Sequence, residues 1–550
     1  MVQLHADRVA LAYDARPVVH DFNLEIEEGK VTTIIGPNGC GKSTVLKSMA
    51  RLLRPTSGAV YLDGSAVHSM PTREVARQVG LLSQSSELPE GVTVEDLVQR
   101  GRYPHQAFLQ PPSKQDTIAV NRAIELAGMG ELRHRPVNEL SGGQRQRAWI
   151  AMVLAQETPI LLLDEPTTYL DLSHQLEVME LVERLNREEG RTIVMVLHDI
   201  NEAARVSHRI VAMRDGRIMG DGTPAEVLTS DILSKLFGVD CDLIPMADEV
   251  PSCGFCMPRS RAGAERRDTG ISNQGFEISR ASTGYGKSII SSNLTMSIPG
   301  GMITALVGPN ACGKSTLMRT CARLQKLGAG TIHLDGRSIA SGTHKELARR
   351  LALLSQDPTV PGDVLVEDLV LAGRSPHQGF LRRWTAEDEA IVDWAIRTCG
   401  LVDLRFRPLG SLSGGQRQRA WIAMSLVQDT DVLLLDEPTT FLDIASQVDL
   451  LDIIWKLNRE QGKTVVMVIH DINLAARYAD HIIAMRDGKV IAQGTPTTVV
   501  TCPLMRLIFD IESDVLKHPE LGTPLMIPLR ASTGSIAGSE QVQVESLAVV

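Results

Sequence analysis

The sequence predicts an α/β fold that occurs twice along the chain. The chain has 550 residues, which exceeds the length of one ordinary domain. Short apolar runs at residues 31–35, 160–163 and 192–197 are typical of strands buried on both faces of a mainly parallel sheet. A helical pattern at residues 175–186 separates two of these runs, as expected when strands and helices alternate.

Composition favours an ordinary globular protein and argues against some classes of partner. Apolar residues make up 43% of the chain, and the formal net charge is -10. A nucleic-acid-binding protein usually carries a basic excess, so we expect no nucleic-acid partner. No apolar stretch approaches the length of a membrane span, and the N-terminus lacks the apolar core of a signal peptide. We therefore expect a cytoplasmic protein whose membrane role, if it has one, comes through a partner.

The second half of the chain repeats the first at a constant interval of 272 residues, as from Lys42 to Lys314. Residues 36–44, 140–144, 164–166 and 198–199 return at 308–316, 412–416, 436–438 and 470–471 without insertion or deletion. Such self-similarity indicates a duplicated unit. We expect domains at residues 1–258 and 276–530, a linker at 259–275 and a disordered tail at 531–550. The pattern indicates no role for the one close cysteine pair, Cys253 and Cys256.

Each half contains a glycine-rich sequence that fits a phosphate-binding P-loop directly after an apolar run. Its glycines let backbone N–H groups surround phosphates, its lysine supplies a cation, and its serine hydroxyl is placed for Mg²⁺. Two matches at equal register make a chance glycine-rich turn an untenable alternative. The expected ATP-binding residues are Gly36, Pro37, Asn38, Gly39, Cys40, Gly41, Lys42, Ser43 and Thr44, with Gly308, Pro309, Asn310, Ala311, Cys312, Gly313, Lys314, Ser315 and Thr316. Ala311 replaces Gly39, and we expect little harm from it.

An Asp-Glu pair ends an apolar run in each half. Asp164 and Asp436 are in the setting of a Walker B carboxylate that holds Mg²⁺. Glu165 and Glu437 follow directly, where each can act as the general base towards an attacking water. A surface acidic pair is the alternative, which the P-loop at a fixed upstream distance disfavours.

The pattern Leu-Ser-Gly-Gly-Gln between P-loop and Walker B resembles the signature of ABC ATPases, and this resemblance covers nearly the whole chain twice. It implies two P-loop NTPase domains of ABC type, each with a mainly parallel sheet core, an antiparallel β patch near the adenine and a helical subdomain. It also implies that the signature residues cap the γ-phosphate of an ATP on the opposing domain; these are Ser141, Gly142, Gly143 and Gln144, with Ser413, Gly414, Gly415 and Gln416.

The same resemblance assigns further residues to the nucleotide. Gln84 and Gln356 resemble Q-loop residues that touch Mg²⁺ and the lytic water. His198 and His470 resemble switch histidines at the γ-phosphate. The D-loop residues would be Asp171 and Asp443, and the adenine-stacking residues Tyr13 and Tyr285. For an isolated tyrosine or histidine, packing or a surface role is the usual fate, but the matched register in both halves favours function.

The sequence within and around these motifs resembles the ATPases of iron-chelate importers (siderophore, haem, cobalamin). The resembling segments are residues 101–106, 140–152, 164–171 and 198–201. The resemblance implies permease subunits and a substrate-binding protein as partners, and a peripheral position on the inner face of the cell membrane. The chelate and the stoichiometry are left open. ABC-F translation factors are the alternative, although they resemble one another in a long charged linker. Sugar importers often have one degraded site, and DNA-repair ABC proteins have zinc-binding cysteines that this chain lacks.

The expected arrangement pairs the two domains head to tail. One ATP would lie between Lys42 and Ser413, and the other between Lys314 and Ser141. ATP binding would close the pair and hydrolysis would release it.

Overall fold

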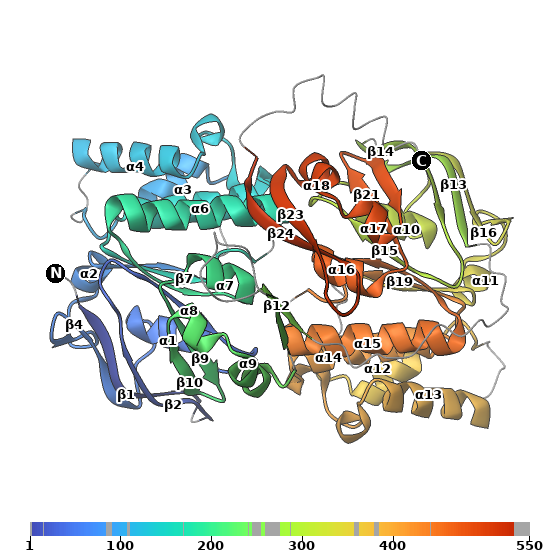
Figure 1. The fold of residues 1–550 in the computed structure, drawn as a ribbon, viewed down its shortest axis with the longest axis horizontal. Coiled ribbons are helices and arrows are strands. Elements are labelled where there is room, and N and C mark those ends of the chain that lie inside the picture. The colour runs from blue at the N-terminus through green and yellow to red at the C-terminus, as the bar shows by residue number, and fades with distance from the viewer. Residues whose placement is uncertain are drawn as a thin grey trace. The chain divides into compact units, whose positions relative to one another are not determined.

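The computed structural model describes residues 3–14, 16–83, 91–106, 111–168, 170–239, 241–244, 255–258, 275–286, 288–356, 362–378, 384–440 and 442–532, without the side chains of Asp242 and of residues 255–258. The chain divides into two compact units at about residue 259 (Figure 1). The linker expected at 259–275 lies outside the described residues except for Gly275, as does the tail from residue 533 onwards. Cys253 lies outside them too. The expected domain boundaries therefore stay predictions.

The strands of the first half are β1 (Leu4–Tyr13), β2 (Arg16–Glu25), β3 (Val31–Ile35), β4 (Ser57–Leu62), β5 (Ser65–Ala66), β6 (Val79–Leu82), β7 (Ile160–Asp164), β8 (Thr192–Val196), β9 (Arg209–Arg214), β10 (Arg217–Gly222), β11 (Cys241–Ile244) and β12 (Phe255–Pro258). Its helices are α1 (Lys42–Met49), α2 (Thr72–Ala76), α3 (Val94–Arg100), α4 (Lys114–Leu126), α5 (Gly142–Ala155), α6 (Leu172–Glu189), α7 (Ile200–Val206), α8 (Pro224–Val227) and α9 (Ser230–Phe237).

The strands of the second half are β13 (Phe276–Tyr285), β14 (Ser288–Ile298), β15 (Ile303–Val307), β16 (Ala329–Leu334), β17 (Arg337–Ser338), β18 (Leu351–Leu354), β19 (Val432–Asp436), β20 (Thr464–Val468), β21 (His481–Arg486), β22 (Lys489–Gly494), β23 (Ile511–Lys517) and β24 (Pro524–Ala531). Its helices are α10 (Lys314–Cys321), α11 (His344–Ala348), α12 (Val366–Ala372), α13 (Ala386–Thr398), α14 (Gly414–Leu426), α15 (Ile444–Gln461), α16 (Ile472–Tyr478), α17 (Pro496–Val499) and α18 (Cys502–Phe509).

Each half is built on a six-stranded sheet whose strands are mainly parallel. The order is β10-β9-β3-β8-β7-β6 in the first half and β18-β19-β20-β15-β21-β22 in the second, with an antiparallel edge pair in each. Every residue of β3, β7 and β8 is buried, which explains why these strands are continuous apolar runs in the sequence. The predicted α/β fold with parallel sheet cores is therefore confirmed.

A separate antiparallel sheet and a group of helices complete each half. In the first half the antiparallel sheet has the order β2-β1-β4-β5. Figure 1 shows α3 and α4 on one side of this half and β1, β2 and β4 on the other. The helices α3, α4 and α5 form the helical subdomain that the resemblance to ABC ATPases implied. Among the described residues, no helix combines the length and apolarity needed to cross a bilayer.

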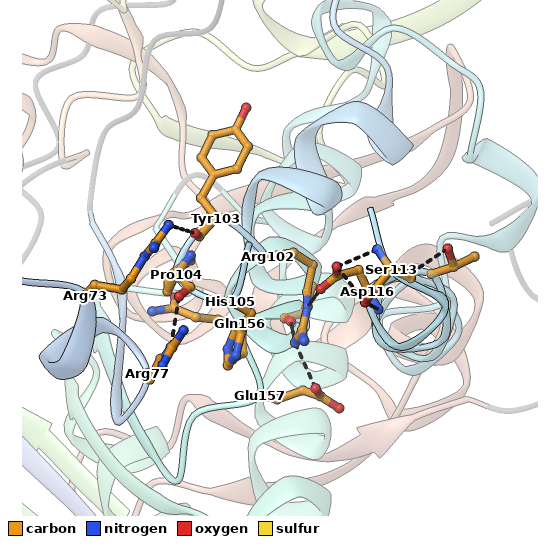
Figure 2. Close-up of polar contacts among 12 residues, drawn as sticks. Arg73, Arg77, Arg102, Tyr103, Pro104, His105, Ser113, Asp116, Gln156 and Glu157 are labelled. Carbon is orange, nitrogen blue, oxygen red and sulfur yellow. Dashed lines mark hydrogen bonds and ion pairs between the residues drawn. The ribbon is translucent and has the colours of Figure 1, made fainter. Parts of the chain in front are cut away.

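A buried ion pair holds the helical subdomain of the first half together (Figure 2). Arg102 is 4% exposed, and its Nε donates to Asp116 Oδ1 over 2.8 Å. Its Nη1 donates to the carbonyl oxygen of Ala155 at the end of α5, over 2.7 Å. Burial alone would raise the pKa of Asp116, but the hydrogen bonds from Arg102 and Ser113 lower it. The pair therefore joins the segment after α3 to the start of α4 and the end of α5.

The same segment is also tied to the core of the half. Arg77, at the end of α2, donates from Nε to the carbonyl oxygen of Pro104 over 2.9 Å. His105 Nε2 lies 2.8 Å from the carbonyl oxygen of Gln156. Figure 2 draws both residues. Residues 101–106 thus form a turn that hydrogen bonds hold between the core and the helices. This segment is one of those that resemble iron-chelate importers. Arg374 and Asp388 repeat the ion pair in the second half.

Replacing Asp116 with alanine should lower the stability of this subdomain by up to about 3–5 kcal/mol, because the buried Arg102 then keeps only the partly exposed Glu157 carboxylate as an ionic partner. Native-state hydrogen exchange of the amides in α4 and α5 measures the loss. Asp231→Ala is the control: it breaks the exposed Asp231–Lys235 pair and should cost less than about 1 kcal/mol. Equal effects of the two variants would contradict a structural role for the buried pair.

Candidate active site in each half

The loop between β3 and α1 holds the predicted lysine against its own backbone. Lys42 is 5% exposed, and its Nζ donates to the carbonyl oxygens of Gly36 and Pro37 over 2.8 and 2.9 Å. Because carbonyl oxygens carry no net charge, the ammonium group keeps an uncompensated positive charge. No side chain caps the start of α1, so the positive end of that helix faces the same loop. The arrangement suits a phosphate anion.

Lys314 repeats this geometry in the second half. Its Nζ donates to the carbonyl oxygens of Gly308 and Pro309, both over 2.7 Å. The two phosphate loops therefore share the lysine–carbonyl hydrogen bonds, and in the second loop Lys314 Nζ also donates to Cys312 Sγ over 3.7 Å.

The glycines of the loop differ in what they tolerate. Gly36 has a φ of 149°, and a Cβ built on it would lie 2.0 Å from the carbonyl oxygen of Met213. Gly39 has a φ of 79°, but nothing lies within 4 Å of a Cβ built there. Ala311 occupies the matching place with a φ of 61°. The methyl group therefore has room, and only the left-handed backbone costs free energy, of order 1 kcal/mol for a non-glycine residue.

An aspartate at the end of β7 meets the serine that opens α1. Ser43 Oγ donates to Asp164 Oδ1 over 2.8 Å, and Ser315 Oγ donates to Asp436 Oδ1 over the same distance. Burial raises the pKa of Asp164; the Ser43 hydrogen bond opposes this rise, and the neighbouring Glu165 carboxylate adds to it.

These oxygen atoms fit a magnesium ion. A hydroxyl and a carboxylate are the hard donors that Mg²⁺ prefers. Asp436 Oδ2 is buried and has no hydrogen-bond partner among the described residues. A divalent cation near that oxygen would compensate its lost hydration.

The glutamate after each aspartate is held by a histidine from the next strand. His198 Nε2 lies 2.6 Å from Glu165 Oε1, and His470 Nε2 lies 2.9 Å from Glu437 Oε1. Burial alone would raise the pKa of Glu165, but the hydrogen bond and charge of His198, the Thr168 hydroxyl and the Lys42 charge together lower it. Glu165 therefore stays ionised near neutral pH and can accept a proton.

The backbone of both glutamates is left-handed. Glu165 has a φ of 51° and Glu437 has a φ of 53°, a region that non-glycine residues seldom occupy. Such backbone costs of order 1–3 kcal/mol, and it is found where function requires a particular side-chain direction. Here it turns the carboxylate towards the histidine that follows β8 or β20.

Sequence reasoning missed two threonines at this site. Thr168 Oγ1 donates to Glu165 Oε2, and Thr440 Oγ1 donates to Glu437 Oε2, each over 3.1 Å. Both threonines lie three residues after the glutamate in both halves, so the repeat itself contained the signal.

The structure describes one of the two predicted glutamines, Gln356, and not the other. Gln356 Nε2 donates to Glu437 Oε2 over 2.7 Å, so the structure brings this residue to the carboxylate. Gln84 lies outside the described residues.

The signature serines begin the helices α5 and α14. Ser141 Oγ accepts from the Gln144 N–H over 3.3 Å, and the Gln144 side chain accepts from the Ser141 N–H over 3.2 Å, which forms a capping box. Ser413 and Gln416 repeat it. The hydroxyl oxygen is the acceptor in this cap, so the hydroxyl proton does not take part in the cap's hydrogen bonds. A Cβ on Gly143 would lie 2.7 Å from the ring of His174, so a larger residue there would have to displace that side chain.

The other predicted residues lie at the ends of elements. Asp171 caps α6 and accepts a hydrogen bond from His174 Nδ1, which raises the pKa of that histidine. Asp443 directly precedes α15. Tyr13 and Tyr285 end β1 and β13, and each is 43% exposed. Within each half the structure thus brings the predicted lysine, serine, aspartate, glutamate and histidine together at the C-terminal ends of the parallel strands. The hydrogen bonds of Ser141, by contrast, are with Gln144 of its own helix.

Comparison with known proteins agrees with this geometry. The ABC transporter family model matches residues 19–168 and 291–440, which together exceed half of the chain. The iron(3+)-hydroxamate import ATP-binding protein FhuC of Bacillus subtilis (strain 168) is 50% identical over 244 residues, 44% of this chain and 91% of FhuC. A Methanosarcina mazei relative, named only as an ABC transporter ATP-binding protein, is 30% identical over 529 residues, 89% of this chain and 88% of the relative.

A solved structure of the archaeal ribosome recycling factor aABCE1, in complex with the ribosomal stalk protein aP1, has a TM-score of 0.63 to this chain. It covers 98% of both chains at 21% sequence identity, which shows the fold alone. The family match, by contrast, covers the phosphate loop, the signature and the Asp-Glu pair of each half. The chain belongs to the ABC transporter family and contains two of its ATP-binding, ATP-hydrolysing domains.

Proposed function

We propose that this chain energises an importer for a ferric siderophore or a related iron chelate. The observation that carries the substrate class is the 50% identity to FhuC, a protein named for iron(3+)-hydroxamate import, over 91% of its length. Permease subunits would form the membrane path, and a substrate-binding protein would deliver the chelate. The ATPase would act peripherally on the inner face of the cell membrane and would not touch the iron itself.

The reaction follows from the charges at each sheet edge. Lys42, the loop N–H groups and the start of α1 would bind the phosphates of ATP. Magnesium, held through Ser43 and Asp164, would neutralise phosphate charge when bound. Glu165 would take a proton from the attacking water, and His198 would hold the carboxylate in position and contact the γ-phosphate. Lys314, Ser315, Asp436, Glu437, His470 and Gln356 would have these roles in the second half.

Each nucleotide would be completed by the opposite half. The signature hydroxyls of Ser141 and Ser413 are not consumed by their helix caps and would donate to a γ-phosphate. We propose the head-to-tail pairs Lys42 with Ser413 and Lys314 with Ser141. Fusion in one chain keeps the partner at an effective concentration in the millimolar range, roughly as for short tethers, so closure need not wait for a second molecule.

A role at the ribosome is the alternative. The likeness to aABCE1 concerns the fold alone at 21% identity, so no observation specifically favours that role. Import of another chelate, such as cobalamin or haem, would use the same ATPase chemistry and differ in the permease.

Replacing Glu165 and Glu437 together with glutamine should reduce ATP hydrolysis by about 10²–10⁴-fold, because the general base is lost. ATP binding should persist, since the phosphate loops are unchanged. Phosphate release and retention of radiolabelled ATP measure the two effects. Glu139→Gln, which changes an exposed glutamate, is the matched control. Hydrolysis at the wild-type rate in the double variant would contradict the assigned base.

Lys42→Ala and Ser413→Ala should weaken the same nucleotide site. Photolabelling with azido-ATP, followed by peptide mapping around Tyr13 and Tyr285, reports the two sites separately. Both variants should reduce labelling near Tyr13 more than labelling near Tyr285. The mirror variants Lys314→Ala and Ser141→Ala should do the opposite. Loss near Tyr285 in Ser413→Ala would refute the head-to-tail pairing.

Deleting the gene should reduce uptake of ⁵⁵Fe presented as a siderophore chelate. The wild-type gene should restore uptake, and the Glu165→Gln, Glu437→Gln gene should not. Normal chelate uptake together with a changed translation rate would instead support the ribosomal alternative.

A further inference from the structure

One residue of the segment at 198–201, which resembles iron-chelate importers, has no role in the site described above. It is the last one, Asn201, and its counterpart in the second half is Asn473. The duplication keeps asparagine at this place although the next residue differs, Glu202 in one half and Leu474 in the other. Asparagine is not a strong helix former, yet Asn473 lies in the first turn of α16. Its contacts therefore show what it does.

The side-chain amide of Asn473 pairs with the backbone of one residue of β24. Asn473 Nδ2 donates to the carbonyl oxygen of Met526 over 2.9 Å, and the Met526 N–H donates to Asn473 Oδ1 over 2.7 Å. An amide carries both a donor and an acceptor, so it satisfies both polar groups of Met526 at once. We term this pair of hydrogen bonds the amide clamp. Figure 1 shows β24 beside α16.

The backbone of Asn473 is held by the residue that follows the histidine. Asp471 caps α16, and its Oδ1 accepts from the backbone N–H groups of Asn473 and Leu474 over 2.7 and 3.0 Å. His470 directly precedes this cap, and its Nε2 lies 2.9 Å from Glu437 Oε1. Asn473 therefore joins β24 to the turn that carries the histidine.

The hairpin of β23 and β24 is anchored to the central sheet independently of Asn473. Arg486, the last residue of β21, donates two hydrogen bonds to the Asp510 carboxylate, over 2.6 and 2.9 Å. Asp510 directly precedes β23, and β21 pairs with β15, the strand that leads into the phosphate loop. Three consecutive residues near the start of β24 are buried, namely Leu525, Met526 and Ile527. The hairpin is therefore a fixed support for α16.

We propose that Asn473 is a positioning residue for the second half: the amide clamp holds α16 against β24 and thereby keeps His470 in contact with Glu437, a role that rests on the catalytic functions proposed for those two residues. α16 has seven residues, which is too short for a helix to hold its place without tertiary contacts. Asn473 would act through His470 and would not touch ATP.

The first half contains the parts of the same arrangement. α7, which carries Asn201, packs against β12. Leu243 of β11 pairs with Cys256 of β12, just as Val515 of β23 pairs with a residue of β24. Because Leu243 and Val515 occupy matching places in the duplication, Cys256 takes the place of Met526. The amide clamp uses only a backbone N–H and a backbone carbonyl group of its strand residue, which cysteine and methionine provide equally. We expect the same role for Asn201.

Asn473→Leu tests the amide clamp, because leucine is close to asparagine in size and forms neither hydrogen bond. Hydrogen exchange is measured on the nucleotide-free full-length chain. Protection of peptides covering 472–478 and 524–529 should fall at least about threefold, the lower end expected for loss of two hydrogen bonds. Arg530→Ala is the matched control: it breaks the exposed pair between Arg530 and Glu512 on the same hairpin and should leave α16 protected. Wild-type protection of α16 in Asn473→Leu would overturn the proposal.

Asn473→Asp keeps the test decisive if the leucine variant does not fold. Its carboxylate can accept from the Met526 N–H, but its second oxygen would face the Met526 carbonyl oxygen, and two acceptors without a proton between them repel each other. Exchange of α16 should therefore rise at neutral pH in this variant as well, and wild-type protection would again contradict the amide clamp.

Steady-state hydrolysis separates positioning from simple stabilisation. Asn473→Leu should lower kcat by up to about twofold if only the second half slows, and by more if the two sites are coupled. The affinity for ADP, which lacks the phosphate that His470 would contact, should not change. In a His470→Ala background Asn473→Leu should cause no further fall, because the residue through which it acts is gone.

The other outcomes are equally distinct. A further fall in the His470→Ala background, equal to the fall in the wild-type background, would show that Asn473 supports the fold alone and would overturn the positioning role. If His470→Ala hydrolyses ATP at the wild-type rate, the function proposed for His470 is refuted. Hydrogen exchange would then still decide whether the amide clamp exists.

Discussion

The common edge of a buried parallel sheet is the constraint on which both sites depend. In the first half β3, β7 and β8 run parallel, with Asp164 opposite Val196 and Ile34 opposite the same residue. The phosphate loop, the Asp-Glu pair and the histidine therefore lie side by side at the C-terminal ends of these strands. A shift of one residue in any strand would turn its side chains to the other face and separate these groups. Full burial of the three strands prevents such a shift.

The site concentrates features that oppose folding. A left-handed glutamate, a nearly buried lysine and a buried aspartate with a raised pKa all lie within a few residues of the sheet edge. Extensive apolar packing around them compensates, because the apolar clusters of the first half include both faces of the same strands. The buried Arg102–Asp116 pair adds rigidity to the helices that carry the signature. Catalytic geometry is thus supported by structure well outside the site.

The sequence was sufficient for the fold because its strongest signals are local. The run at residues 31–35 became β3 without change, and the pattern at 175–186 became α6 over a longer range, Leu172–Glu189. Its ends were missed because the cap by Asp171 and the left-handed Gly190 are hydrogen-bond and backbone features, which apolar periodicity does not report. The contact of Gln356 with Glu437 follows from motif identity, whereas the hydrogen bond from Gln146 to the carbonyl oxygen of Pro166 joins residues 20 positions apart and depends on tertiary placement.

The exact register of the duplication has an evolutionary consequence. A subunit that pairs with its own copy carries every substitution at both sites, so neither site can change alone. Here Gly39 and Ala311, or Glu202 and Leu474, occupy matching places on a single polypeptide. Mutation can therefore alter one half while selection retains the other in unchanged form. Covalent duplication thus allows the two ATPase domains to evolve different rates of hydrolysis, and it always supplies the two domains in equal number.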